Sequence, residues 1–230
     1  MFEQHNIISF IFTFLPVLIY SIIVFVAMPV NIIKWKIASF FFSMGVLSTI
    51  LVNAVHYTFP NWDIPMHEDQ IIAIFLSSFL KIGLLEESCK YILYRMTEWY
   101  RGDSIDHPSA IMFYAMSVSC GFAVSENILY AQIYGGDVLF IRSVSSVLVH
   151  MICGLTIGYF IALGKTQNRV TLLSLVGIIV ATLYHALYDF NIFVNGDEGI
   201  QTTFLILGVG LVGSYSMANN LFTHDDSTVL

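Results

Sequence analysis

Long apolar runs alternate with short polar connectors along the whole chain. A membrane-spanning helix needs about 20 mainly apolar residues. The candidate spans that meet this requirement are 7–30, 37–59, 69–95, 109–134, 138–163, 170–194 and 201–222. The connectors hold most of the proline and the loop-type polar residues. The pattern therefore predicts an all-α fold, a polytopic membrane helix bundle of about seven transmembrane helices.

The composition also indicates a membrane protein. Of the 230 residues, 57% are hydrophobic and 11% are charged, whereas a soluble domain carries about 25% charged residues. No repeat or linker divides the chain, so we predict one integral-membrane domain over residues 1–230 with its motifs at roughly 70–195. No basic tract indicates a nucleic-acid partner. The lipid bilayer is the expected surrounding.

The basic residues near the ends of the spans predict the orientation in the membrane. They fall in or beside the first, third and fifth connectors, at Lys34, Lys36, Arg95, Arg101, Lys165 and Arg169. The alternate connectors contain no lysine or arginine. Because cytoplasmic loops carry an excess of these residues, we predict an outside N-terminus and a cytoplasmic C-terminus.

The three cysteines all lie within apolar segments, at Cys89, Cys120 and Cys153. Their spacing matches neither a disulfide framework nor a zinc ribbon. We therefore expect buried free thiols.

Charged and polar residues inside the predicted spans are the strongest functional signal. They are Lys81, Glu86, Glu87, Lys90, Glu126, Asn127, Arg142, His150, His185 and Asp189. A charge at mid-bilayer costs roughly 2.5–3.5 kcal/mol and usually faces the bundle interior. The glutamates and histidines lie about 13 to 25 Å from the predicted cytoplasmic ends of their spans. Four helices therefore contribute to one middle band.

Spacing within the spans predicts which of these groups share a helix face. Glu86 and Lys90 are four residues apart, as are His185 and Asp189, so each pair can interact. Gly154 and Gly158 follow His150 at the same period, which favours close packing of that face against another span. Lys81 and Arg142 either pair inside the bundle or extend to the membrane surface.

Four motifs in four successive spans resemble the PrsW family of intramembrane proteases. "EESCK" fits E-E-x-x-K, "CGFAVSENILY" fits a Gly-Phe segment ending in Glu-Asn, His150 opens the third motif, and "HALYDF" fits H-x-x-x-D. This family is related to the CAAX-prenyl proteases and the bacteriocin-processing enzymes. The resemblance covers roughly residues 70–195.

The resemblance implies roles for individual residues. In PrsW-like proteins the paired glutamates and the last histidine are essential, which points to Glu86, Glu87 and His185. Glu126 stands where the CAAX-type relatives carry a catalytic histidine in F-x-x-x-H. Asp189 stands where they carry an asparagine that binds the oxyanion. The resemblance also implies a protease of the prokaryotic cell membrane. Its substrate would be a single-span membrane protein, such as an anti-sigma factor in site-1 cleavage near the outer membrane boundary.

Amide hydrolysis needs an activated water, a proton donor for the leaving amine and a donor for the oxyanion. Two adjacent glutamates in a low dielectric repel, so one should hold a proton while Lys90 keeps the other ionised. We assign Glu86 as the base for water, although the two glutamates could exchange roles. Glu87 and Lys90 would position Glu86, and Glu126 or His150 would make a second contact to the water. His185 would donate a proton to the oxyanion or the leaving group, and Asp189 would fix the tautomer of His185. Asn127 is predicted as a supporting residue of the site.

Glutamates and histidines are also metal ligands. No H-E-x-x-H or E-x-x-H pair is present, and Lys90 would compete with a metal ion for the glutamates. We therefore predict a glutamic-type peptidase without a cofactor, and metal dependence stays open.

Two other functional classes also stay open. One is a proton- or ion-coupled transporter, because buried acids and histidines form proton relays. The other is a non-catalytic scaffold, like the multispan scaffold subunit of γ-secretase that resembles these proteases.

Overall fold

The computed structural model describes residues 2–27, 33–59, 71–101, 105–134 and 136–225. Every element in these ranges is helical. The elements are α1 (Phe2–Ala27), α2 (Trp35–Thr58), α3 (Ile71–Leu76), the π-helix η3 (Ser77–Gly83), α4 (Leu84–Arg101), α5 (Pro108–Tyr134), α6 (Gly136–Thr166), α7 (Val170–Asn195), the short 3₁₀-helix η4 (Gly196–Gly199) and α8 (Ile200–Asp225).

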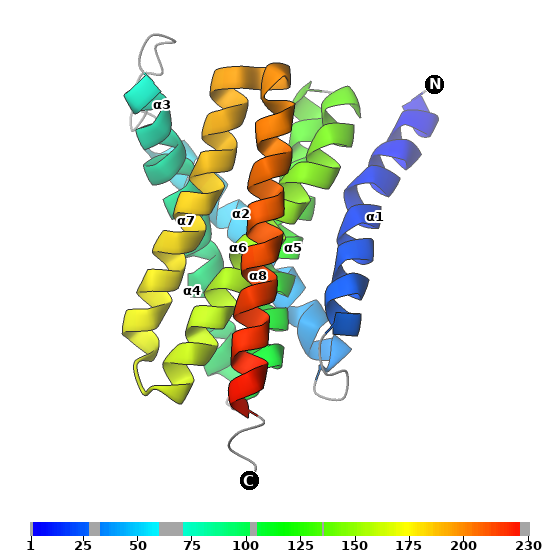
Figure 1. Cartoon of the computed structure of the whole chain (residues 1–230). Helices are drawn as coiled ribbons and strands as arrows, with labels where there is room; N and C mark the ends of the chain where they lie inside the picture. Colours follow the sequence, from blue (N-terminus) through cyan, green and yellow to red (C-terminus); the bar gives the residue numbers. More distant parts are fainter. Residues whose placement is uncertain (1, 28–32, 60–70, 102–104, 135, 226–230) are drawn as a thin grey trace.

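The helices run up and down through one bundle, as Figure 1 shows. Elements α3, η3 and α4 follow one another without a break, so together they form the third of the predicted spans. Helices α5 and α6 are the most buried and pack most extensively on each other. Helix α2 packs on α5, and α7 packs on α6. Helix α1 lies at the edge of the bundle. Among the described elements, its main contacts are with α5 and α6.

Five of the described helices are long and apolar enough to cross a membrane, namely α2, α5, α6, α7 and α8. The segment formed by α3, η3 and α4 is as long as these helices, but α4 carries several charged residues. In α1, the apolar segment Phe14–Val26 is shorter. Large apolar side chains project outward from the peripheral helices, for example Ile50, Leu183, Phe204 and Val212. Lipid chains are a favourable surrounding for such side chains. The predicted polytopic helix bundle is confirmed.

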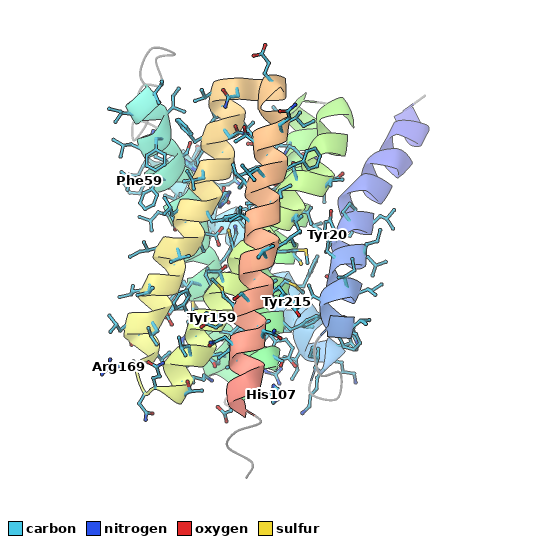
Figure 2. All side chains as sticks on the ribbon, in the orientation of Figure 1. Tyr20, Phe59, His107, Tyr159, Arg169 and Tyr215 are labelled. Atoms are coloured by element: carbon cyan, nitrogen blue, oxygen red, sulfur yellow. The ribbon has the colours of Figure 1, made fainter. Side chains whose placement is uncertain are left out.

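The charged end of the bundle follows the predicted pattern. Helices α1, α4 and α6 end at the same side of the bundle as the C-terminus, and α2, α5 and α7 begin there (Figure 1). Figure 2 shows Arg169 and His107 at this side. The basic residues therefore gather at one end, although the side of the membrane that this end faces stays a prediction. The expected buried free thiols are confirmed for all three cysteines.

Two glycines allow α2 and α5 to touch along their backbones. A Cβ atom on Gly45 would overlap the carbonyl oxygen of Val118, and one on Gly121 would overlap the carbonyl oxygen of Phe42. Small residues at such crossings let membrane helices pack by van der Waals contact, which replaces the hydrophobic effect as the driving force there.

The predicted packing of the His150 face is also confirmed. A Cβ atom on Gly154 would lie 2.8 Å from the Cα of Met116, and one on Gly158 would lie 2.6 Å from the Cα of Met112. Helix α6 therefore lies directly against α5 below His150. This contact brings His150 beside Phe122 and Glu126 of α5.

The π-helix precedes the two glutamates. A π-turn holds more residues than an α-turn, so side chains on either side of it point in different directions than a continuous α-helix would give. Gly83 ends this segment, and its added Cβ would lie 3.0 Å from the carbonyl oxygen of Thr182 on α7. The close contact with α7 brings the first turn of α4, with Glu86 and Glu87, beside the middle of α7, where His185 contacts Glu87.

Replacing Gly45 with alanine should lower the free energy of unfolding by about 1–3 kcal/mol, because the added methyl group forces α2 away from the Val118 carbonyl. Thermal unfolding in detergent micelles measures the change. Gly208→Ala is the matched control, because a Cβ at Gly208 meets nothing within 4 Å. Equal stability of the two variants would contradict the packing described here.

Candidate active site

Lys90 lies at the centre of a buried polar network. Its Nζ lies 2.8 Å from Glu87 Oε1, 3.4 Å from Glu86 Oε2 and 2.9 Å from His150 Nδ1. The ammonium also lies 3.8 Å from the centroid of the Phe122 ring. These partners compensate for the loss of water around a side chain that is only 2% exposed.

His185 on α7 joins the network through Glu87. Its Nδ1 lies 3.0 Å from Glu87 Oε1, the oxygen that also contacts Lys90. Its Nε2 lies 3.4 Å from Asp189 Oδ2 and 3.9 Å from Glu86 Oε2. The last two distances are within range of an ion pair, and Asp189 Oδ2 accepts no hydrogen bond from the described residues. His185 is therefore fixed through Nδ1, while Nε2 is the less engaged nitrogen.

Glu126 on α5 forms the third part of the network. Its Oε2 accepts a hydrogen bond from Arg142 Nη2 at 2.8 Å and lies 3.0 Å from His150 Nε2. The Ser146 hydroxyl makes a longer contact of 3.5 Å with the same oxygen. The Arg142 guanidinium stacks over the Tyr130 ring at 3.6 Å. His150 thus bridges Glu126 and Lys90.

The structure brings together seven of the eight residues predicted for the site. They are Glu86, Glu87, Lys90, Glu126, His150, His185 and Asp189, from α4, α5, α6 and α7. Asn127 is different: it is fully buried, but neither its Oδ1 nor its Nδ2 has a hydrogen-bond partner within the described part of the chain. It follows Glu126 by one helix position and so points about 100° away from it.

Arg142 also belongs to the network, although the sequence left open whether it pairs inside the bundle or extends to the membrane surface. The structure shows that it pairs with Glu126 inside the bundle. A signal for this was present: Arg142 precedes His150 by eight residues, a spacing that puts two side chains on one helix face. The face that His150 directs into the site therefore also directs Arg142 there.

The network is more open on one side than on the other. The side chains of Glu126, Arg142 and Asp189 are 15, 16 and 14% exposed, whereas those of Glu86 and Glu87 are 7 and 0% exposed. The first three come from the end of α5, the start of α6 and the end of α7. These segments lie in the half of the bundle away from the C-terminus (Figure 1). The network is therefore most exposed towards that half.

Four residues of the network could hold a metal ion. One ligand atom each of Glu86, Glu87, His150 and His185 lies within 4.8 Å of the others, and all four residues are buried. Carboxylate oxygens and imidazole nitrogens are ligands of Zn²⁺, and Glu87 Oε2 has no hydrogen-bond partner among the described residues. The donor set fits a metal ion. The Lys90 ammonium, however, contacts three of the same four side chains.

A carboxylate beside an imidazole in a water-poor site can carry out general acid–base chemistry, because each group can exchange a proton with a bound water or substrate. The two histidine rings lie 4.8 Å apart at 89° to each other, next to the glutamates. The site therefore contains a candidate base, a candidate proton donor and a fixed cation within one small volume.

The chain is similar to known proteins over the part that contains this site. The family model described as "PrsW family intramembrane metalloprotease" matches residues 34–215, which include every candidate site residue. "Protease PrsW" of Oceanobacillus iheyensis is 29% identical over 150 residues, and "Protease PrsW" of Bacillus subtilis is 36% identical over 121 residues. These matches cover 65% and 50% of this chain and 66% and 54% of the two relatives. No solved structure matches the chain.

Replacing Lys90 with methionine should destabilise the protein by roughly 3–5 kcal/mol, because the buried glutamates lose the cation between them. Chemical or thermal unfolding in detergent measures the effect. Adding Glu87→Gln should recover part of the lost stability, since it removes one uncompensated carboxylate. Lys36→Met, at an exposed position, is the control. If Lys90→Met unfolds like this control, the charge balance described above is wrong.

Proposed function

This chain belongs to the PrsW family, and from that membership we propose that it is an intramembrane protease. The activity would be hydrolysis of a peptide bond in a membrane-anchored protein by a water that a glutamate activates. One observation carries the proposal: Glu86 and Glu87 lie buried beside His185 and Lys90. These are the groups that amide hydrolysis needs, and a purely structural ion pair would need only one acid.

The contacts favour Glu86 over Glu87 as the base. Glu87 Oε1 is held by Lys90 at 2.8 Å and by His185 at 3.0 Å, so it is committed to positioning them. Glu86 has only the longer contacts of 3.4 and 3.9 Å. A carboxylate that is less tightly held can accept the proton of a water as the water oxygen attacks the carbonyl carbon of the substrate.

His185 is the proposed donor to the oxyanion or to the leaving amine. Its Nδ1 is engaged by Glu87, and its Nε2 lies on the side of Glu86 and Asp189. A proton on Nε2 would stabilise the negative charge that develops on the carbonyl oxygen. In this proposal Asp189 acts through His185, because an ionised carboxylate would repel an oxyanion. His150 orients Lys90, and Glu126 or His150 makes the second contact to water.

The family description names a metalloprotease. A metal ion bound by Glu86, Glu87, His150 and His185 would polarise the substrate carbonyl and activate water. We propose instead that Lys90 serves as the cation of the site. Its ammonium contacts Glu86, Glu87 and His150, and a divalent ion would have to displace it from all three side chains.

The proposed substrate is a single-span membrane protein, such as an anti-sigma factor. The more exposed side of the network, at Glu126, Arg142 and Asp189, is where its chain would approach. We further propose that the N-terminus lies outside the cell and the C-terminus in the cytoplasm, because the basic residues gather at the end of the bundle where the C-terminus lies. Cleavage would then occur towards the outer half of the membrane. The similarity to bacterial proteins supports a prokaryotic membrane as the location.

Glu86→Gln should reduce proteolysis by about 10²–10⁴-fold, because glutamine keeps the shape of the side chain but cannot accept the proton. The assay reconstitutes the purified protein in lipid vesicles with single-span membrane proteins, including anti-sigma factors, and identifies fragments by mass spectrometry. Glu198→Gln is the matched control, at an exposed position. Full cleavage by Glu86→Gln would reject the assignment. Cleavage of no substrate by the wild type would favour the transporter interpretation.

Exhaustive chelation of the reconstituted protein should leave its proteolytic activity unchanged within about twofold, because Lys90 supplies the positive charge of the site. The measurement compares initial cleavage rates before and after chelator treatment, with metal content determined in parallel. A loss of activity that added Zn²⁺ restores would show that a metal ion, and not Lys90, performs this role.

A further inference from the structure

His150 connects the two halves of the polar network through its two ring nitrogens. Nδ1 lies 2.9 Å from Lys90 Nζ, and Nε2 lies 3.0 Å from Glu126 Oε2. The side chain is 1% exposed, so neither nitrogen can exchange its partner for bulk water. A neutral imidazole carries one N–H and one acceptor nitrogen, and the partners decide which nitrogen is which.

The contacts of His150 with Lys90 and Glu126 together select its tautomer. An ammonium group has donors and no acceptor, and Lys90 is held as an ammonium by Glu86 and Glu87. His150 Nδ1 therefore accepts as long as the Glu126 contact keeps the ring facing Lys90. The proton then resides on Nε2, which donates to Glu126.

Arg142 keeps the Glu126 oxygen in position to accept this bond. Its Nη2 lies 2.8 Å from the same Oε2 that faces His150, and 3.3 Å from the Ser146 hydroxyl. A guanidinium is always charged and only donates. The Tyr130 ring, at 3.6 Å, supports the guanidinium from its other side. Without Arg142 the Glu126 carboxylate, which is 15% exposed, could turn towards the open side of the site.

We propose that Arg142 is a positioning residue that acts through Glu126 to hold His150 as its Nε2–H tautomer, so that Nδ1 orients Lys90 over the two glutamates. The catalytic consequence rests on the proposed function, whereas the tautomer does not. The same tautomer would present the Nδ1 lone pair to a metal ion if Lys90 moved away from it. The inferred tautomer is therefore the same with or without a metal ion, whereas the orientation of Lys90 applies to the metal-free site.

The tautomer can be measured directly by NMR. The full chain with ¹⁵N-labelled histidine is studied in detergent micelles, and His150 is assigned by comparison with His150→Gln. Long-range ¹H–¹⁵N correlations distinguish an Nε2–H from an Nδ1–H imidazole. We expect Nε2–H in the wild type and a mixture of tautomers in Arg142→Gln. Arg142→Lys, which keeps the charge, should retain Nε2–H, and Arg169→Gln is the exposed control.

Kinetics of the same variants test the consequence for catalysis. Arg142→Gln should lower kcat by about 10–100-fold, the usual effect of removing a group that orients a functional histidine. KM should change by less than about twofold, because Arg142 positions the site and does not bind substrate. Arg142→Lys should recover most of the lost kcat.

If Arg142→Gln does not fold, the neutral pair Arg142→Gln/Glu126→Gln replaces it, because this pair leaves no unpaired buried charge. Its His150 should likewise lose the single Nε2–H tautomer. An Nδ1–H tautomer in the wild type, or an unchanged tautomer and kcat in the variants, would overturn the proposal. A wild type that shows Nε2–H but cleaves no substrate would count against the proposed function alone.

Discussion

A charge buried among membrane helices must be neutralised by groups that the protein itself holds in place. Lys90 meets this requirement for two glutamates at once and reaches His150 as well. Because His150 lies on α6 and His185 of α7 contacts Glu87, the ion cluster requires α4, α6 and α7 to meet at one level. The backbone contacts of α5 with α2 and α6 allow this approach. The fold and the candidate chemistry therefore have a common basis, since the groups that neutralise each other are those that could act on a peptide bond.

Much of the fold could be predicted from the sequence, because the penalty for polar groups in lipid is strong and local. Each long apolar run became a helical pass, and the ends differ from the prediction by only a few residues, except that the third pass continues to Arg101. The same penalty revealed the site. Glu86, Glu87, His150 and His185 are too costly in lipid to be placed at random, and all four lie in contact within one network.

The rotation of each helix about its axis could not be predicted in the same way. Asn127 was expected to support the site beside Glu126, but it points elsewhere because neighbouring positions differ by about 100°. Arg142 near the end of a span had two plausible environments, and only the packing of α6 on α5 decides between them. The π-helix ends at Gly83, which packs against Thr182 of α7. No local sequence pattern encodes such a contact.

The uneven exposure of the polar network imposes an order of events on the proposed reaction. The side chains of Glu86 and Glu87 are nearly fully buried, whereas those of Glu126, Arg142 and Asp189 are partly exposed. A membrane-protein chain that docks at these three residues would cover the more exposed side of the network. The water that is consumed must then already be inside when the substrate arrives, and each further turnover must wait until a product has left and the site has rehydrated. Product release and rehydration would then limit the turnover rate of such an enzyme. That rate would depend on how quickly the products diffuse away in the bilayer.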